Sequence, residues 1–259
     1  MKAYECVQAS RSAGRPTALS YIRALVEDFT EMHGDRRFGD DPAVVAGIGT
    51  LNGMPVTVIG IEKGTTTAEK LYRNFGSANP EGYRKALRQI RLAEKFHRPI
   101  LCLVDTSGAY CGIGAEERGQ GQAIAENMYE LITVRTPSIS IMIGEGGSGG
   151  ALALAVTDEV WMLEDAYYSV ISPEGAASIL WKDAGRAREA AESLKLTAQD
   201  LHGFGIIERV LPCAEALEKD MDGLKEELVA AFRKKTQMGV DALLEARYAR
   251  FRKIGGEPV

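Results

Sequence analysis

The sequence predicts an α/β protein in which small ββα units stack into one domain. Three observations favour this class. Two β-prone runs flank Asn52-Gly53, which is the strongest hairpin signal in the chain. The stretches 100–133 and 138–156 each have the pattern of a buried strand, a glycine-bearing loop and a helix. An amphipathic helix expected over 81–96 lies between the hairpin and the first of these stretches.

Composition excludes several classes of protein. The 259 residues are 45% hydrophobic, enough for one large domain or two small ones, and the net charge of -5 leaves no electrostatic footprint for nucleic acid. No apolar run approaches the ~20 residues of a membrane span, and no apolar signal segment opens the chain. The four cysteines lack metal-ligand spacing, so we expect a reduced cytoplasmic protein without a metal site.

The N-terminal region contains one expected helix. Residues 1–15 are polar and aperiodic, and we expect a loose arm. Thr17 is a plausible N-cap for a helix whose apolar positions continue from Leu19 to Phe29. The charged segment 33–42 is expected to form a solvated turn.

The next elements are the hairpin and its following helix. The runs 44–51 and 54–61 are the two hairpin strands. Lys63 follows in a loop, where we favour a surface lysine over a phosphate ligand. The helix over 81–96 ends near His97, where a cation suits the helix dipole.

Two strand–loop–helix units form the middle of the chain. Residues 100–104 are a buried apolar run that ends in the loop 105–114, and a helix is expected over 116–133. The isoleucine-rich run 139–143 is a second buried strand, which we expect to stop at the glycine cluster 144–150 before a tightly packed helix. Ligands gather at such strand ends in α/β proteins, although two ordinary turns would give the same pattern.

The C-terminal third alternates short strands and helices. Ser172 is expected to cap a helix that begins at Pro173, and Thr197 the second of two helical pieces. Residues 214–252 are charged and helical, with apolar positions that the core or a partner must cover. The expected strands of this part cover 159–163, 167–172 and 206–211.

The glycine cluster supports three interpretations. It is a tight helix-on-strand contact, a phosphate cradle or an oxyanion hole. A Walker loop needs a lysine, and none occurs between Val134 and Ala166. Gly144, Gly146 and Gly149 do spell G-x-G-x-x-G after a strand, but that match alone is weak. An oxyanion hole needs only backbone N–H donors, which a strand, a glycine loop and a helix start can aim at one point.

Several motifs resemble one family, the α subunits of bacterial acetyl-CoA carboxylase carboxyltransferase. The resemblance covers about residues 15–211, and its motifs include Asn74-Phe75-Gly76, 80–88, 105–120, 144–152 and 168–175. The sequence departs from the family at Ser107 and Cys111, where prolines are usual, so that loop is expected to be less rigid.

The resemblance implies a crotonase-like (ClpP/crotonase) spiral of ββα units with flanking helices. It divides a single carboxyltransferase domain, 1–259, into the arm 1–15, a core over 16–211 and C-terminal helices over 212–259. It implies transfer of carboxylate from carboxybiotin to acetyl-CoA, giving malonyl-CoA for fatty acid synthesis. The biotin is carried on a separate biotin carboxyl carrier protein. The implied partners are a β subunit, in an α2β2 assembly, and biotin carboxylase.

The resemblance also implies site residues. The backbone N–H groups of Gly146 and Gly147 would hold the biotin ureido oxygen, and we expect a valine at Gly147 to abolish transfer while leaving the fold soluble. No histidine lies in either loop, so a Ser-His-Asp hydrolase is disfavoured. The implied substrate-binding residues are Gly108, Ala109, Tyr110, Gly112, Ser148, Gly149, Ser172 and Gly175.

Three alternatives stay open. The chain is a carboxyltransferase subunit for another acyl-CoA, a crotonase-fold acyl-CoA hydratase or isomerase, or a non-catalytic scaffold subunit. A hydratase would need glutamates near a thioester oxygen, and Glu116, Glu117 and Glu145 are the candidates. Activity on an enoyl-CoA without biotin or partner would separate the second alternative from transfer.

Overall fold

The computed structural model describes residues 1–256 and has a mixed sheet of eight strands. The order is β1-β2-β3-β4-β5-β6-β8, and β7 pairs with the end of β5. The predicted α/β class is therefore confirmed. The strands are β1 Glu27–Glu31, β2 Val44–Leu51, β3 Met54–Ile61, β4 Ile100–Thr106, β5 Ser138–Gly147, β6 Glu159–Leu163, β7 Tyr167–Ser169 and β8 Arg209–Leu211.

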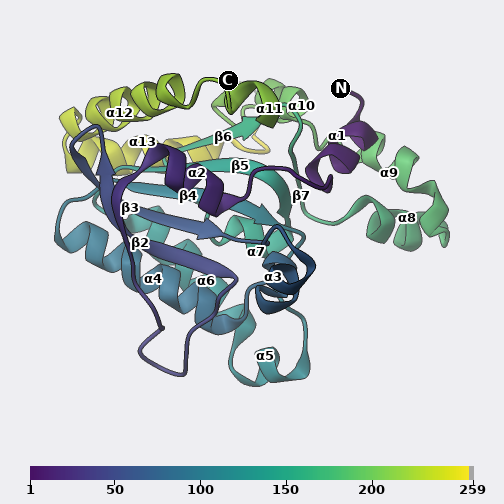
Figure 1. Cartoon of the computed structure of the whole chain (residues 1–259). Coiled ribbons are helices and arrows are strands. Elements are labelled where there is room, and N and C mark those ends of the chain that lie inside the picture. The colour runs from purple at the N-terminus through teal and green to yellow at the C-terminus, as the bar shows by residue number, and fades with distance from the viewer. Residues whose placement is uncertain (257–259) are drawn as a thin grey trace.

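Helices cover both faces of this sheet. Helices α4 and α6 lie on one face, whereas α2 and α12 lie on the other (Figure 1). The described helices are α1 Ala3–Ser10, α2 Ala18–Leu25, α3 Thr67–Tyr72, α4 Pro80–Lys95, α5 Ile113–Glu117, α6 Gln120–Thr133, α7 Ser148–Leu152, α8 Pro173–Trp181, α9 Ala187–Leu194, α10 Ala198–Gly203, α11 Ala214–Leu217, α12 Met221–Gln237 and α13 Val240–Lys253.

The predicted hairpin is present. Strands β2 and β3 pair antiparallel in an unbroken register from Val44–Ile61 to Leu51–Met54. Asn52 and Gly53 have φ values of 46° and 74°, which is the left-handed conformation that a tight hairpin turn requires. From β3 onwards the neighbouring strands β3, β4, β5, β6 and β8 run parallel. Their carboxyl ends therefore meet at one edge of the sheet.

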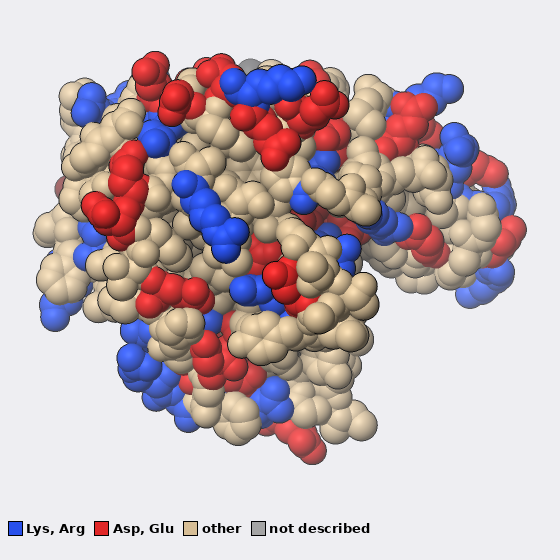
Figure 2. Space-filling model, viewed as in Figure 1, with Lys and Arg blue, Asp and Glu red and all other residues tan. Residues whose placement is uncertain are grey.

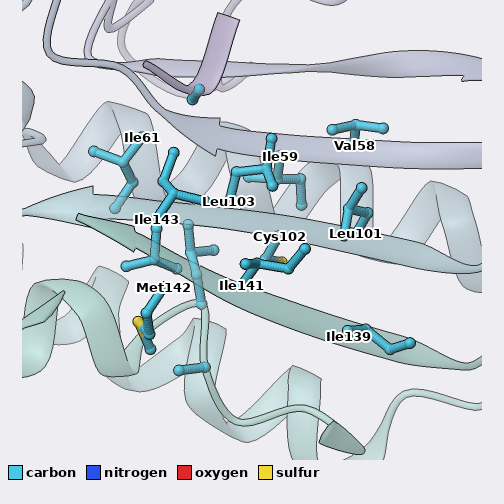
Figure 3. Close-up of a cluster of buried hydrophobic side chains, with 14 of the residues drawn as sticks. Val58, Ile59, Ile61, Leu101, Cys102, Leu103, Ile139, Ile141, Met142 and Ile143 are labelled. Carbon is cyan, nitrogen blue, oxygen red and sulfur yellow. The ribbon is translucent and has the colours of Figure 1, made fainter. Parts of the chain in front are cut away.

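The central strands are buried on both faces, as their continuous apolar runs predict. Side chains from β3, β4 and β5 pack together in the cluster that Figure 3 shows, with Val58, Leu101 and Ile139 among them. At about 25 cal/mol per Å² of buried apolar surface, this cluster is a main source of the fold's stability. It gives the loops at the strand ends a rigid base.

The expected loose arm over 1–15 is wrong for its first part, which forms α1. Ala3, Cys6, Val7 and Ser10 are buried there, on a narrow stripe of small residues at helical spacing. The stripe is short and most of its residues are only weakly apolar, so the helix is hard to predict from this segment alone. Helix α1 thus packs against α9 and the end of the sheet, so this part of the arm is held in place.

Two expected helix boundaries are also wrong. Helix α2 ends at Leu25, and Phe29 lies in β1, because β2 offers an edge with which this segment pairs. The helix expected over 116–133 is two helices, α5 and α6, separated at Gly119, whose φ is 80°. The expected N-caps of α8 and α10, Ser172 and Thr197, are confirmed by their side-chain hydrogen bonds.

The charged tail packs onto the core within this chain. Leu228 and Phe232 of α12 and Leu243 of α13 are buried. The expected C-terminal segment 212–259 is helical in its described part, and residues 257–259 lie outside the described residues. None of the helices described is both long and apolar enough to cross a membrane. Among the residues drawn in colour, Figure 2 shows acidic and basic side chains interspersed over the face in view.

Candidate functional site

The two predicted glycine loops meet where β4 and β5 end. A Cβ atom added to Gly147 would lie 2.2 Å from the carbonyl oxygen of Ser107, and one added to Gly150 would lie 2.6 Å from the amide nitrogen of Ala109. Only glycine allows two backbones to approach so closely. A valine at Gly147 would therefore displace the neighbouring loop, so this variant would change the backbone of the site as well as any oxyanion donor.

The strand expected to stop at the glycine cluster continues through it. Gly146 is paired with Thr106 of β4 and Tyr168 of β7, and Gly147 is paired with Ser169 of β7. Both glycines are buried. The partner strand β7 comes from a later part of the chain, so the local sequence could not indicate this pairing.

The surface of the site begins at the next residues, where α7 starts. Ser148 is exposed and has a φ of 53°, a left-handed conformation that is strained for a residue with a side chain. Gly149 is half-buried beside it. The first backbone N–H groups of any helix have no acceptor within that helix, so those of Ser148 and Gly149 have none within α7.

A groove of about 420 Å³ opens beside Ser148 and Gly149. Its walls are mainly apolar and include Leu152, Tyr168 and Phe251. Burial raises the pKa of Tyr168 to about 12, so its phenol stays protonated at neutral pH. The sequence did not indicate these walls, because they come from four distant segments.

Arg250 of α13 adds a cation to the groove. Its guanidinium donates to the backbone oxygen of Ile206 at 2.7 Å and is paired with Glu208. The groove thus combines an apolar surface with one guanidinium group, whose charge Glu208 balances. Such a combination suits a largely apolar ligand that carries a polar head.

The loop after β4 is held by hydrogen bonds to its backbone. Gln120 donates from one amide nitrogen to the carbonyl oxygens of Ala78 and Tyr110, both at 2.8 Å. The ring of Tyr110 lies over Gly112, where a Cβ would approach it to 2.5 Å. Cys111 is an exposed free thiol. Gly108 and Ala109 lie against the β5–α7 junction, whereas Tyr110 and Gly112 form the outer part of the loop.

Ser172 and Gly175 have a local structural role. The hydroxyl of Ser172 accepts a hydrogen bond from the N–H of Gly175 at 3.1 Å, which caps α8. Helix α8 lies beyond the end of the sheet, apart from α7 (Figure 1). The structure therefore does not bring these two predicted residues against Ser148 and Gly149.

A cluster of charged side chains lies behind the glycine junction. The amine of Lys63 is 2.7 Å from the Asp105 carboxylate and 2.6 Å from that of Glu145, and all three side chains are largely buried. Burial opposes the charge on Lys63, but the two carboxylates outweigh it and raise its pKa. The sequence favoured a surface lysine at this position, and that prediction is wrong. Lys63 is largely buried, and its amine is held between two carboxylates.

The remaining glutamates do not form an acid–base site. Burial disfavours the charged form of Glu145, but Lys63, Arg11 and Tyr167 outweigh it and lower its pKa, so it is ionised at neutral pH. Glu116 and Glu117 are exposed on α5. A hydratase needs a carboxyl group that can exchange a proton at the reacting carbon, and none of these three offers one at the groove.

Comparison with known proteins identifies relatives along the whole chain. A family model described as acetyl co-enzyme A carboxylase carboxyltransferase-like matches residues 1–255. The acetyl-coenzyme A carboxylase carboxyl transferase subunit alpha of Ruminiclostridium cellulolyticum is 59% identical over 256 residues, which are 98% of each chain. That of Clostridium acetobutylicum is 55% identical and covers 95% of this chain and 92% of its own.

Solved structures share the fold. A transcarboxylase 12S structure has a TM-score of 0.68 at 19% identity and covers 86% of this chain and 44% of its own. A Pseudomonas malonate decarboxylase hetero-tetramer has a TM-score of 0.66 at 19% identity, and the match covers 85% of this chain and 82% of the other. These likenesses extend to the crotonase-like arrangement of sheet and helices.

Proposed function

Because the chain belongs to the family of acetyl-CoA carboxylase carboxyltransferase α subunits, we propose that the β5–α7 junction is where it stabilises the charge that develops during carboxyl transfer. The enzyme class and the reaction follow from the family. Which atoms of this chain serve the reaction is the proposal. The observation that carries it is the exposed start of α7 beside the groove, where backbone N–H groups have no acceptor within the helix.

Carboxybiotin, presented on a carrier protein, supplies the carboxylate, and negative charge grows on its ureido oxygen as the carboxylate leaves. The junction's backbone N–H groups would donate hydrogen bonds to that oxygen. Gly146 and Gly147, the expected donors, are buried and paired with β7, whereas Ser148 and Gly149 line the groove, so the proposal extends the set of donors to these two residues. Losing one donor of this kind typically costs about 3–4 kcal/mol in the transition state.

The groove fits the expected ligand. A Cβ on Gly149 would meet only Ile124, at 3.7 Å, so the space in front of this residue is open. The apolar walls would bind the fused rings of biotin, and Gly108, Ala109, Tyr110 and Gly112 would shape the opposite side. Ser172 and Gly175 would contribute only indirectly, by capping α8 and so fixing its position.

The implied assembly is part of the same proposal. A β subunit, in an α2β2 complex, would bind acetyl-CoA and hold its enolate, while a biotin carboxyl carrier protein and biotin carboxylase would supply the carboxylate. The malonate decarboxylase relative is itself a hetero-tetramer, which supports a paired arrangement. The α subunit would then contribute only the biotin half of the site.

The experiment replaces Gly149 with valine in the assembled enzyme. Carboxylation of free biotin from malonyl-CoA, the reverse of the transfer step, is measured by release of acetyl-CoA. We expect Gly149→Val to slow this reaction at least about 100-fold, because the side chain fills the space before the donors, while the thermal midpoint stays near wild type.

Gly121→Ala is the matched control. Gly121 lies in the first turn of α6, and a Cβ there meets no atom within 4 Å. This variant should transfer carboxylate at the wild-type rate. Near-wild-type transfer by Gly149→Val in a correctly assembled complex would refute the placement of the site at the α7 start.

A further inference from the structure

Strand β5 bulges away from β4 just before the glycine junction. Val104 pairs with Met142, and the next pair is Thr106 with Gly146. One residue of β4, Asp105, therefore lies opposite three residues of β5, Ile143 to Glu145. A bulge of this kind redirects the strand that carries it, and bulges are common next to active sites. Here it sets the direction in which Gly146 and the residues after it leave the sheet.

Side chains replace ladder hydrogen bonds within the bulge. The Asp105 carboxylate accepts the N–H of Glu145 at 2.8 Å. Arg15 donates to the carbonyl oxygen of Ile143 from two nitrogens, at 2.9 and 2.7 Å. A Cβ on Gly144 would lie 2.5 Å from the Asp105 carboxylate, so that carboxylate fills the space beside Gly144. The bulge is thus built around one buried carboxylate.

Lys63 joins the two sides of this bulge. It lies in the loop just after a third strand, β3, and contacts Asp105 of β4 and Glu145 of β5 with one amine. Glu145 has further partners, since Arg11, directly after α1, is 2.7 Å away and the hydroxyl of Tyr167 of β7 is 2.8 Å away. Within residues 1–256, Lys63 is the only ion-pair partner of Asp105.

We propose that Lys63 is a positioning residue for carboxyl transfer, which fixes the bulge and thereby aims the N–H groups of the β5–α7 junction. The proposal rests on the function proposed above. Lys63 touches no reacting atom in it. Its role is to cancel the repulsion between two buried carboxylates whose separation sets the course of β5.

Removing the amine leaves two carboxylates without a counter-ion between them. In Lys63→Met, Asp105 and Glu145 face each other without the cation that both contact. The two carboxylates then repel each other and the junction shifts. A displacement of about 1 Å at a reacting centre is enough to cost on the order of 100-fold in rate.

The test compares Lys63→Met with Lys63→Met/Asp105→Asn in the assembled enzyme at pH 8. The reverse transfer to free biotin gives kcat and the KM for malonyl-CoA. We expect Lys63→Met to lose on the order of 100-fold in kcat, with an unchanged KM. In the double variant the neutral amide can donate to Glu145 and the repulsion between two carboxylates is removed, so at least tenfold of the kcat should return.

Lys70→Met is the matched control, because Lys70 lines the same surface cavity as Lys63 and Glu145 and forms no ion pair with any residue the structure describes. It should leave kcat unchanged. A wild-type kcat in Lys63→Met would overturn the proposal. A loss that Asp105→Asn does not relieve would also overturn it, since a purely structural defect behaves in that way.

Two further results keep the test decisive. If Lys63→Met does not assemble, the double variant decides: kcat within tenfold of wild type supports the proposal, and a lower value overturns it. The Gly149→Val result separates this inference from the proposed function. Transfer lost in Gly149→Val but intact in Lys63→Met refutes only the role of Lys63, whereas transfer intact in Gly149→Val removes the site itself.

Discussion

Replacing Arg247 with methionine should destabilise the protein strongly. The Arg247 side chain is fully buried in the interior behind α6, and its Nε is 2.8 Å from the buried carboxylate of Asp158. The same guanidinium donates to the backbone oxygens of Leu131 and Val134 at the C-terminal end of α6, at 2.9 and 2.7 Å. Methionine keeps most of the volume but leaves Asp158 as a buried charge without its partner.

The expected loss follows from this burial. Breaking a buried ion pair by removing one partner costs about 3–5 kcal/mol. For a chain of this size, 1 kcal/mol corresponds to about 2–4 °C, so a loss of about 4 kcal/mol lowers the thermal midpoint by about 8–16 °C. Urea unfolding followed by circular dichroism gives the free energy of unfolding, and the thermal midpoint comes from a separate scan.

Two variants test the reasoning behind this number. Arg91→Met removes a half-exposed pair with Glu130, and should cost less than about 1 kcal/mol. Asp158→Asn added to Arg247→Met should recover part of the loss, because a neutral amide replaces the unpaired charge. A loss below about 1 kcal/mol in Arg247→Met, or a double variant less stable than the single one, would refute the reasoning.

Two further predictions concern Ser148 and Asp35. Ser148→Gly should be about 1 kcal/mol more stable than Ser148→Ala in urea unfolding, because glycine adopts a φ of 53° without strain, and equal stabilities would contradict this. Burial disfavours the Asp35 carboxylate, but the N–H groups of Phe38 and its neighbours and the Arg84 guanidinium outweigh it and lower its pKa to about 2. This pKa shift contributes about 2 kcal/mol to the free energy of unfolding at any pH well above 4, the pKa of an Asp in the unfolded chain, and the contribution is lost as the pH falls from 4 to 2. In Asp35→Asn the free energy of unfolding should therefore fall less steeply between pH 4 and 2 than in the wild type. An unchanged slope would contradict this.

The sequence predicted those parts of the fold that short-range patterns determine. The hairpin at Asn52-Gly53, the buried strands and the caps at Ser172 and Thr197 depend on residues within a few positions of one another. The meeting of the two glycine loops was also predictable, because parallel strands end at the same edge of a sheet. The two loops indicated the general location of the site, whereas the family was inferred from the motifs within and around them.

The parts it could not predict depend on the register between strands. The continuation of β5 through Gly147 requires β7 as a partner, and the bulge opposite Asp105 requires β4 to be offset from β5. Lys63, Asp105 and Glu145 each follow or end an apolar strand, which is a signal that a search for charges at strand ends would find. The walls of the groove, such as Phe251, give no such signal because α13 reaches them only through tertiary packing.

The contact between Gly144 and Asp105 also restricts how this region can change. A side chain at position 144 would occupy the space that the Asp105 carboxylate fills, so no single substitution there is neutral. Removing Asp105 first would open that space but would leave the N–H of Glu145 without its acceptor and Lys63 with Glu145 as its remaining partner. Directed evolution by single steps should therefore leave this pair untouched and accumulate its changes elsewhere, as at Gly121 of α6, where an added methyl group meets no neighbouring atom within 4 Å.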